Sequence, residues 1–384
     1  MMEDVTRDLD LDLFVDDLRT LVGYRTVVCR NPDAFARARD WIRQFLADAD
    51  AEFLDFDVDG MTSTIIRPRG SPRPALIGDA HLEVVPAADP MFELRRDGTR
   101  LYGRGTADMK TALLTLLYVM RELLTGDDHR DLWLVITEDE EVGSRRGAQC
   151  IVDHLVDRDL MPPVAFVPDG GYDLAYVERE KGTAVIRAVA GGDGGHASRP
   201  WKVTNPIATM LAFVRDCLDL FPVPPDATTW QSSITPTMIA AGTTTNQIPD
   251  ECRAVLDLRY TEDHSPSDVR ARINDLADSN GVTVRFAKLD PAAHYPREAP
   301  IAAAYLDVLR DVVDGEPVIE HSAGASNGRF YAAHGTHVLM TGPRAGGAHS
   351  RLEWVDASSL PAYHELVHRT VELVSDRVRS GSAP

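Results

Sequence analysis

The sequence predicts an α/β domain that is interrupted by a smaller α+β domain, and three observations support this. The chain has 384 residues, which is too long for one ordinary core and indicates two domains. Residues 51–170 alternate strand-like and helix-like patterns, as expected of an α/β sheet. After Asp169 the pattern changes, and residues 181–189 alternate like a half-buried antiparallel strand.

Helical apolar spacing predicts two helices before the first strand, over 8–23 and 32–48, the second beginning near Pro32. The inserted domain follows the order strand, helix, strand, strand, helix, strand. This order is typical of a ferredoxin-like fold with its helices on one face. The expected segments are 181–189, 205–220, 233–241, 253–259, a helix that starts at Ser265-Pro266-Ser267-Asp268, and 282–286.

The α/β pattern resumes near Tyr295 and ends in a helix over about 358–380. We therefore expect the first domain to comprise residues 1–181 and 295–384. The inserted lid domain is expected to comprise residues 182–294. Neither part contains an internal repeat or a low-complexity segment.

Acidic and imidazole side chains recur where predicted strands end. The apolar run 132–136 is followed by four acids, 138–141, and adjacent carboxylates repel one another unless a positive group lies among them. The carboxyl ends of strands in an open α/β sheet are where such folds place their ligands. A surface turn explains one such cluster but not its recurrence along the chain. The side chains concerned are His81, Asp108, Glu140, Glu141, Asp169 and His349.

This set of side chains predicts a pair of metal ions. Imidazole and carboxylate ligands without a thiolate suit zinc, cobalt or manganese. Two metal ions roughly 3.5–4 Å apart need one carboxylate to bridge them. The set divides so that Asp108 bridges, His81 and Asp169 complete one metal site, and Glu141 and His349 complete the other.

Two carboxylates remain outside these ligand sets. Glu140 is adjacent to a predicted ligand, and a free carboxylate beside an activated water acts as a general base. Glu83 lies two residues after His81, and its carboxylate is expected to accept the second ring N–H of that histidine.

Composition excludes several classes of partner. The net charge of −20 argues against binding to nucleic acid or to anionic membranes. No apolar run reaches the roughly 20 residues of a membrane span, and the start of the chain lacks a signal-peptide pattern. The four cysteines are far apart and indicate neither a disulfide framework nor a thiolate zinc site. We expect a soluble cytoplasmic protein.

Three motifs resemble those of the dinuclear zinc hydrolases that include aminoacylase, acetylornithine deacetylase, succinyl-diaminopimelate desuccinylase and glutamate carboxypeptidase. They stand at His81–Pro86, Tyr102–Lys110 and Asp139–Gly143. The resemblance implies a zinc-exopeptidase-like catalytic domain with the same division of metal ligands. It also implies a deacylase or exopeptidase that cleaves the amide bond of an N-acyl amino acid or small peptide. Water would attack with Glu140 as base, and the two ions would be zinc, with cobalt or manganese as alternatives.

The inserted domain also resembles the lid of that family. Gly195–Pro200 is similar to a family motif whose histidine, here His196, helps to hold the substrate carbonyl oxygen across a dimer. Asn246 and Arg259 lie in elements that contact the substrate carboxylate in some relatives, and Arg329 is a further candidate for that contact. A homodimer formed through the lid is implied by the resemblance alone.

Two departures from the family pattern are visible. Glu83 stands where aspartate is usual, so its carboxylate meets His81 differently and metal affinity is expected to change. Asn327 stands where relatives often carry aspartate, and the lost charge is expected to alter substrate preference. Two alternatives therefore remain, a catalytically silent binding protein and an amide-forming biosynthetic enzyme on the same fold.

A rival motif lies near the end of the chain. His364-Glu365-Leu366-Val367-His368 matches the H-E-x-x-H pattern, in which two histidines one helical turn apart bind zinc. Only Glu372 follows as a candidate third ligand. We interpret the match as chance on an amphipathic helix, so that replacing His364 should leave activity intact.

Overall fold

The computed structural model describes residues 9–126, 130–226 and 228–381, and these form two compact units. Unit 1 comprises residues up to Glu178, Tyr295–Glu320 and the chain from Ser326 onward, and unit 2 comprises Arg179–His294 and His321–Ala325. The short segment 321–325 thus joins unit 2, although its place in the sequence predicted the first domain. Within unit 2, the Lys181 N–H donates to the Ser322 carbonyl at 3.1 Å.

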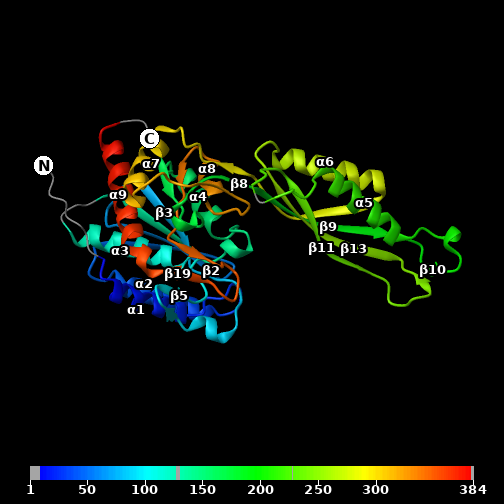
Figure 1. The fold of residues 1–384 in the computed structure, drawn as a ribbon, viewed down its shortest axis with the longest axis horizontal. Helices are drawn as coiled ribbons and strands as arrows, with labels where there is room; N and C mark the ends of the chain where they lie inside the picture. Colours follow the sequence, from blue (N-terminus) through cyan, green and yellow to red (C-terminus); the bar gives the residue numbers. More distant parts are fainter. Residues whose placement is uncertain (1–8, 127–129, 227, 382–384) are drawn as a thin grey trace. The chain divides into compact units, whose positions relative to one another are not determined.

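A six-stranded sheet forms the centre of unit 1 (Figure 1). Its order is β1-β2-β6-β3-β7-β17. The strands β6, β3, β7 and β17 run parallel to one another, and β2 is antiparallel to both of its neighbours, β1 and β6. Every residue of β3 and β6 is buried. The parallel strands therefore deliver their carboxyl ends to one edge of the sheet, as predicted. The bounds are β1 Ala51–Val58, β2 Met61–Pro68, β3 Leu76–His81, β6 Leu132–Thr137, β7 Val164–Phe166 and β17 His337–Leu339.

Helices cover the sheet of unit 1. α3 packs on β3 and on α9, while α4 packs on β6 and α8 on β17. α3 is buried along most of its length, and its first residue follows Asp108 by two positions. The helices are α1 Leu11–Gly23, α2 Pro32–Phe45, α3 Lys110–Thr125, α4 Ala148–Asp157, α7 Pro300–Val313, α8 Gly328–Ala332 and α9 Leu360–Arg379.

Shorter elements complete unit 1 and its boundary with the rest of the chain. One small sheet has the order β18-β19-β5-β4, and another has the order β15-β8-β16. These strands are β4 Arg95–Asp97, β5 Arg100–Tyr102, β8 Tyr176–Glu180, β15 Ala293–His294, β16 Ile319–Ser322, β18 Ala345–Gly346 and β19 Trp354–Asp356. Single 3-10 turns lie at Asp89–Phe92, Glu140–Val142, Tyr172–Leu174 and Ala357–Ser359 in unit 1, and at Pro200–Lys202 in unit 2.

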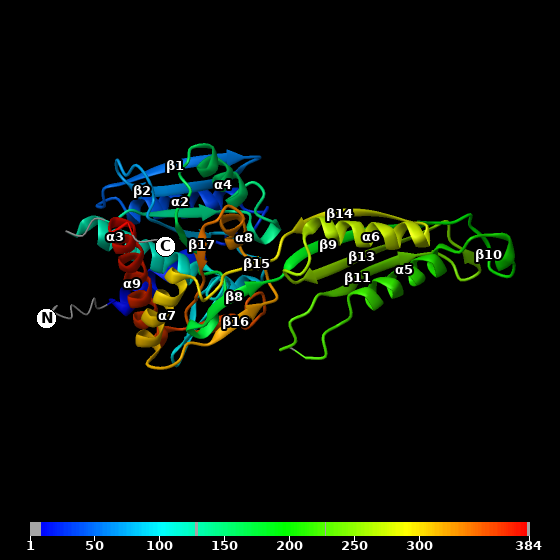
Figure 2. The ribbon, with the colours of Figure 1, turned by 90° about the horizontal axis from the view of Figure 1, so that it is seen from above.

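Unit 2 has the predicted ferredoxin-like order. Its antiparallel sheet runs β11-β13-β9-β14, and α5 and α6 lie together on one face (Figures 1 and 2). Alternate residues of β9 and β13 point into the core beneath these helices, which explains the period-two pattern in the sequence. The elements are β9 Gly182–Gly191, α5 Pro206–Leu220, β11 Ser233–Ala241, β13 Glu251–Tyr260, α6 Pro266–Asn280 and β14 Val282–Asp290.

A two-stranded ribbon, β10 Gly195–His196 with β12 Gln247–Ile248, extends unit 2. Within the described ranges, no helix combines the length and the apolar character that crossing a membrane requires.

Candidate metal centre

Six side chains from distant parts of the sequence meet at the carboxyl edge of the six-stranded sheet. His81 ends β3, and Asp169 follows β7 by three residues. Glu140 and Glu141 open the 3-10 turn after β6. Asp108 precedes α3, and His349 lies in the loop between β18 and β19. The sheet topology and two loops thus produce the cluster that the strand ends predicted.

Asp108 lies between the two histidines of the cluster. Its Oδ1 is 2.8 Å from His81 Nε2, and its Oδ2 is 3.0 Å from His349 Nε2. His349 Nε2 is also 2.8 Å from Glu141 Oε1, and His81 Nε2 is 3.9 Å from Asp169 Oδ1. One carboxylate therefore presents a different oxygen to each imidazole, which is the arrangement that a bridging ligand requires.

The imidazoles carry the positive charge among these carboxylates in the metal-free chain. Hydrogen bonds to Asp108 and Glu141 raise the pKa of His349 to about 10. Burial alone would lower the pKa of His81, but the carboxylates of Glu83 and Asp108 raise it well above its usual range. Burial would raise the pKa of Asp108, yet hydrogen bonds to both histidines hold it below its ordinary value.

The residues present fit divalent cations. Ligand atoms of His81, Glu140 and Asp169 lie within 4.8 Å of one another, as do those of His81, Asp108 and Glu141. Burial and the charge of Asp169 raise the pKa of Glu140, while burial and Asp108 raise that of Asp169. Crowded, partly buried carboxylates of this kind are stabilised by a metal ion, and imidazole with carboxylate suits zinc-like ions.

Glu83 supports the centre in a different way from the predicted one. The His81 Nδ1–H is 3.0 Å from the backbone carbonyl of Glu83, whereas the Glu83 carboxylate is 3.7 Å from Nδ1. That carboxylate instead accepts the N–H of Glu141 at 3.0 Å. The longer glutamate side chain reaches past the imidazole to the acidic turn. Burial raises the pKa of Glu83 to about 8 despite the nearby charge of His81.

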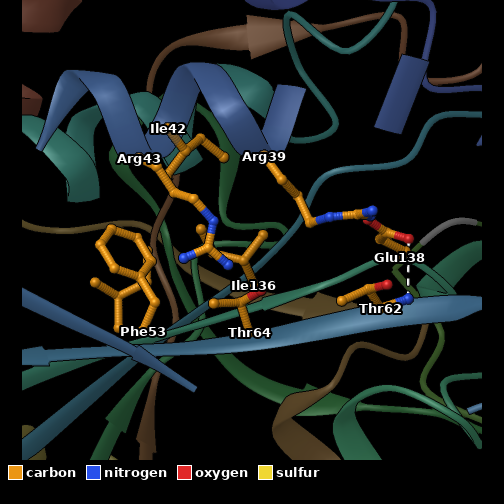
Figure 3. A pocket seen from close by; sticks show the side chains of 9 residues that line it. Arg39, Ile42, Arg43, Phe53, Thr62, Thr64, Ile136 and Glu138 are labelled. Carbon is orange, nitrogen blue, oxygen red and sulfur yellow. Dashed lines mark hydrogen bonds and ion pairs between the residues drawn. The ribbon is translucent and has the colours of Figure 1, made fainter. Parts of the chain in front are cut away.

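The four consecutive acids divide into two pairs with different tasks. Glu138 forms an ion pair with Arg39 of α2 and accepts the Thr62 N–H, as Figure 3 shows. Asp139 accepts the backbone N–H of Arg146 at 2.8 Å. These two acids fix the turn, and their successors, Glu140 and Glu141, face the centre.

Glu353 is a functional candidate that sequence reasoning did not assign. Its side chain is fully buried, and its Oε1 accepts three backbone N–H groups. The donors are Gly105 at 2.8 Å, Ala107 at 3.0 Å and Asp108 at 3.2 Å. Three such bonds to one oxygen hold the turn that carries Asp108.

Arg104 joins this turn to the loop of His349. Its guanidinium forms a buried ion pair with Glu353 and donates to the carbonyls of His349 and Ser350, each at 3.2 Å. One ion pair thus positions the backbone of two predicted ligands that are 241 residues apart, since 349 − 108 = 241. In the sequence, the signal for this interaction was the presence of Arg104 in the Tyr102–Lys110 motif.

Asn327 does not line an open surface. It is buried, and its Nδ2 donates to Asp79 Oδ1 at 2.8 Å, while the Tyr331 hydroxyl donates to Asp79 Oδ2 at 2.8 Å. Burial raises the pKa of Asp79 to about 6. Asp79 lies two residues before His81, so the departure at 327 acts on packing beneath the centre. The expected effect on substrate preference is not supported by this position.

Arg329 is also buried, with 2% of its surface exposed. It donates to the Ser326 carbonyl, and its Nη2 is 3.5 Å from Ser144 Oγ. Its charge lowers the pKa of Glu140, against the larger effect of burial. The guanidinium therefore stands behind the acidic turn, and a direct contact with substrate needs a different conformation from this one.

The remaining predicted substrate contacts belong to unit 2. His196 is exposed, and its Nδ1 accepts from the Ser198 N–H at 3.2 Å. The β10–β12 ribbon brings Asn246 to it, because the Asn246 carbonyl accepts the N–H of residue 197 at 2.9 Å. Arg259 lies on β13, where its guanidinium makes two bonds to Asp257, at 2.7 and 3.3 Å.

Comparison with known proteins identifies the family. A sequence model described as peptidase family M20/M25/M40 matches residues 78–373. Because this match covers most of the chain, the protein belongs to that family, and the resemblance seen in the sequence is confirmed.

Two curated relatives are succinyl-diaminopimelate desuccinylases. The protein of Alkalilimnicola ehrlichii is 29% identical over 335 residues, covering 81% of this chain and 86% of its own length. That of Nitrosomonas europaea is 28% identical over 346 residues, covering 83% and 90%.

Solved structures share the fold. The M20 family metallo-carboxypeptidase Sso-CP2 from Sulfolobus solfataricus matches with a TM-score of 0.76 and 15% identity over 94% of this chain and 99% of that one. The Bacillus subtilis YXEP protein, named a dinuclear metal binding peptidase from the M20 family, matches with a TM-score of 0.70 and 13% identity over 95% and 98%. At these identities the structures show the fold alone.

The Arg104→Met substitution tests the supporting ion pair. It leaves the Glu353 carboxylate buried without its partner and loosens the loops of Asp108 and His349. We expect zinc affinity, measured by calorimetry on metal-stripped protein, to fall about 10- to 100-fold. The control is Arg344→Met, which removes an exposed pair with Asp173 and should leave the affinity unchanged. Equal affinity in the two variants would show that the pair does not position the ligands.

Metal affinity is expected to rise with pH. Because the pKa of His349 in the folded metal-free chain is about 10, above its ordinary 6.5, zinc must displace its proton. The proton on His349 contributes its full stabilisation of the folded metal-free chain below pH 6.5, and this stabilisation is lost as the pH rises through 10. Apparent affinity should increase about tenfold per pH unit for each proton released.

Zinc titrations at pH 6.5, 7.5 and 8.5 against a chromophoric chelator measure this slope. In the His349→Ala variant, the slope of log zinc affinity against pH should be smaller by the contribution of one proton. A slope of zero in the unmodified protein would contradict the proposed competition between proton and metal.

Proposed function

We propose that this M20-family protein hydrolyses the amide bond of an N-acyl amino acid or a small peptide, with two divalent ions, zinc first among them. The observation that carries the proposal is the placement of Asp108 between His81 and His349, at 2.8 and 3.0 Å. The names of the curated relatives, succinyl-diaminopimelate desuccinylases, support an N-acyl amino acid as substrate. A catalytically silent protein would lack a ligand or the base, and each of the six predicted positions carries the residue type that its proposed role needs.

We assign the ligand sets as the sequence predicted them. His81, Asp108 and Asp169 would hold one ion, and Asp108, Glu141 and His349 would hold the other. When bound, such ions polarise the substrate carbonyl and lower the pKa of water towards neutrality. The chain itself supplies the orientation, because Glu83 fixes the backbone at Glu141 and Glu353 fixes it at Asp108.

Glu140 is the proposed general base. Burial and the charge of Asp169 raise its pKa, so its carboxylate is a better proton acceptor than an exposed glutamate. It takes one proton from the attacking water as the new C–O bond forms. It then delivers that proton to the nitrogen as the C–N bond breaks, which yields a free amine and a carboxylic acid that loses the second water proton to solvent and becomes a carboxylate.

Unit 2 supplies the groups proposed to hold the substrate. Because the Ser198 N–H donates to Nδ1 of His196, the proton of the neutral imidazole lies on Nε2. Nε2–H is therefore ready to donate to the carbonyl oxygen as it gains charge. Asn246 and Arg259 are the candidates for the substrate carboxylate, although Arg259 already shares its guanidinium with Asp257.

A homodimer through unit 2 is part of the proposal. In the described residues β11 lies at an edge of its sheet, and Met238 and Ile239 on this strand are 67% and 55% exposed. An exposed apolar edge strand is a template for pairing with another chain. The cytoplasmic location also stays a prediction, supported by four free cysteine thiols.

A panel of N-acetyl amino acids, N-succinyl amino acids and dipeptides, tested after loading with zinc, cobalt or manganese, examines the proposed reaction. We expect at least one class to be hydrolysed with release of a free amine. The Glu140→Gln variant should bind metal normally and lose about 10²- to 10⁴-fold in kcat.

The control is Glu316→Gln, which removes an exposed pair with Arg310, and its kcat should stay within about twofold of that of the unmodified protein. Turnover retained in Glu140→Gln would refute the base assignment. A fully metal-loaded protein that cleaves none of the three substrate classes would refute the proposed reaction.

The double substitution Met238→Glu with Ile239→Lys tests the dimer. Charges on the outer edge of β11 should convert a dimer to a monomer in size-exclusion chromatography with light scattering. Leu211→Glu on α5, a position 56% exposed in the same unit, serves as the control and should remain dimeric. A monomeric unmodified protein, or a dimeric double variant, would contradict this interface.

A further inference from the structure

A second set of metal-ligating side chains lies where α9 packs against α3 in unit 1. His364 and His368 are one helical turn apart on α9, and each has only 1% of its surface exposed. Glu122 comes from the last turn of α3. Its Oε2 is 3.1 Å from His364 Nε2 and 2.5 Å from His368 Nε2. Two imidazoles and one carboxylate oxygen thus converge on one point.

This cluster gives the H-E-x-x-H motif a role that differs from both sequence interpretations, the zinc motif of metallopeptidases and a chance match. The group that converges contains Glu122 and the two histidines but neither Glu365, the base of the motif in metallopeptidases, nor Glu372. The third partner comes from a helix 246 residues earlier in the chain, counted from His368. The motif therefore forms a ligand set without a catalytic base.

Hydrogen bonding alone satisfies this cluster poorly. His364 Nδ1 is buried without a hydrogen-bond partner, and His364 Nε2 shares the single Oε2 atom of Glu122 with His368 Nε2. Leaving a buried donor or acceptor without a partner is costly. One carboxylate oxygen faces both Nε2 atoms, and a single cation between the three groups would satisfy all of them.

Local electrostatics also favour a cation at this point. Glu122 adds a negative charge to the carboxyl end of α3, where the helix dipole already places partial negative charge. Positive charge is stabilised at such an end. Because the Glu122 side chain is 39% exposed, an ion can enter from the solvent side and keep a water as its fourth ligand.

We propose that Glu122, His364 and His368 form a third cation site, separate from the pair at the sheet edge, that takes one transition-metal ion such as Zn²⁺. Two imidazole nitrogens and a carboxylate oxygen suit zinc, nickel or copper, whereas magnesium and calcium prefer oxygen alone. Ligand bonds of about 2.0–2.1 Å in a tetrahedral site separate the ligand atoms by roughly 3.3 Å. The 3.1 Å distance is close to this, and a small rotation of Glu122 opens the 2.5 Å distance.

The site is structural. It joins α9 to the C-terminal end of α3, whereas Asp108 precedes the N-terminal end of that helix. It contains no base and contacts no residue of the centre, so it does not depend on the proposed function. The expected effect of metal binding here is on stability and on metal content.

Zinc stoichiometry tests the proposal without any substrate. Metal-stripped protein titrated with Zn²⁺ should bind three equivalents per chain. The His364→Gln/His368→Gln variant should bind two and keep the activity of the unmodified protein. The control His154→Gln alters a histidine of α4 that stacks on Phe56, and it should bind three. Equal zinc stoichiometry in the unmodified protein and in the double variant would overturn the proposal.

A second measurement guards against misfolding of the double variant. In a His81→Ala/His349→Ala background, in which the centre lacks both imidazoles, saturating Zn²⁺ should raise Tm by about 3 °C. Adding Glu122→Gln, a nearly isosteric change at a partly exposed position, should abolish that rise. An unchanged rise in the triple variant would place the zinc elsewhere and refute the site.

Discussion

Repulsion among crowded, partly buried carboxylates is the constraint on which the rest of this structure depends. Asp108, Glu140, Glu141 and Asp169 share one sheet edge, and such groups cannot all ionise there unless positive charge lies among them. In the metal-free chain His81 and His349 supply that charge as imidazolium ions. Replacing these protons by two cations would satisfy the same constraint with more charge, which supports the proposed metal centre.

The layer beneath the centre obeys the same rule with different partners. Glu353 is neutralised by Arg104 and accepts backbone N–H groups, whereas Asp79 accepts hydrogen bonds from the neutral amide of Asn327 and the Tyr331 hydroxyl. Each of these buried acids is paired within the protein, so none competes for the cations. Their pairing fixes the strand end and the loops, and the predicted ligands inherit that rigidity. The proposed site on α9 repeats the logic at a helix end, where two imidazoles face one acid.

Much of the fold was predictable because it depends on local periodicity. The strand over 233–241 and the helices of the insert follow from apolar spacing and capping residues, and the ligand positions follow from where strands end. The prediction was wrong for Glu83, because its backbone carbonyl faces His81 Nδ1 while its carboxylate accepts the Glu141 N–H, a partner that the spacing from His81 does not reveal. The burial of Asn327 depends on which tertiary neighbours surround it, and no sequence window contains them. Glu122 illustrates the same limit, since its partners lie on the last helix.

Anomalous diffraction at the zinc absorption edge, from crystals grown with zinc, tests the central claim most directly. The account predicts two peaks roughly 3.5–4 Å apart, one on each side of the Asp108 carboxylate, within ligand distance of His81 and of His349 respectively. A single peak at this edge of the sheet, or a pair that Asp108 does not separate, would contradict it.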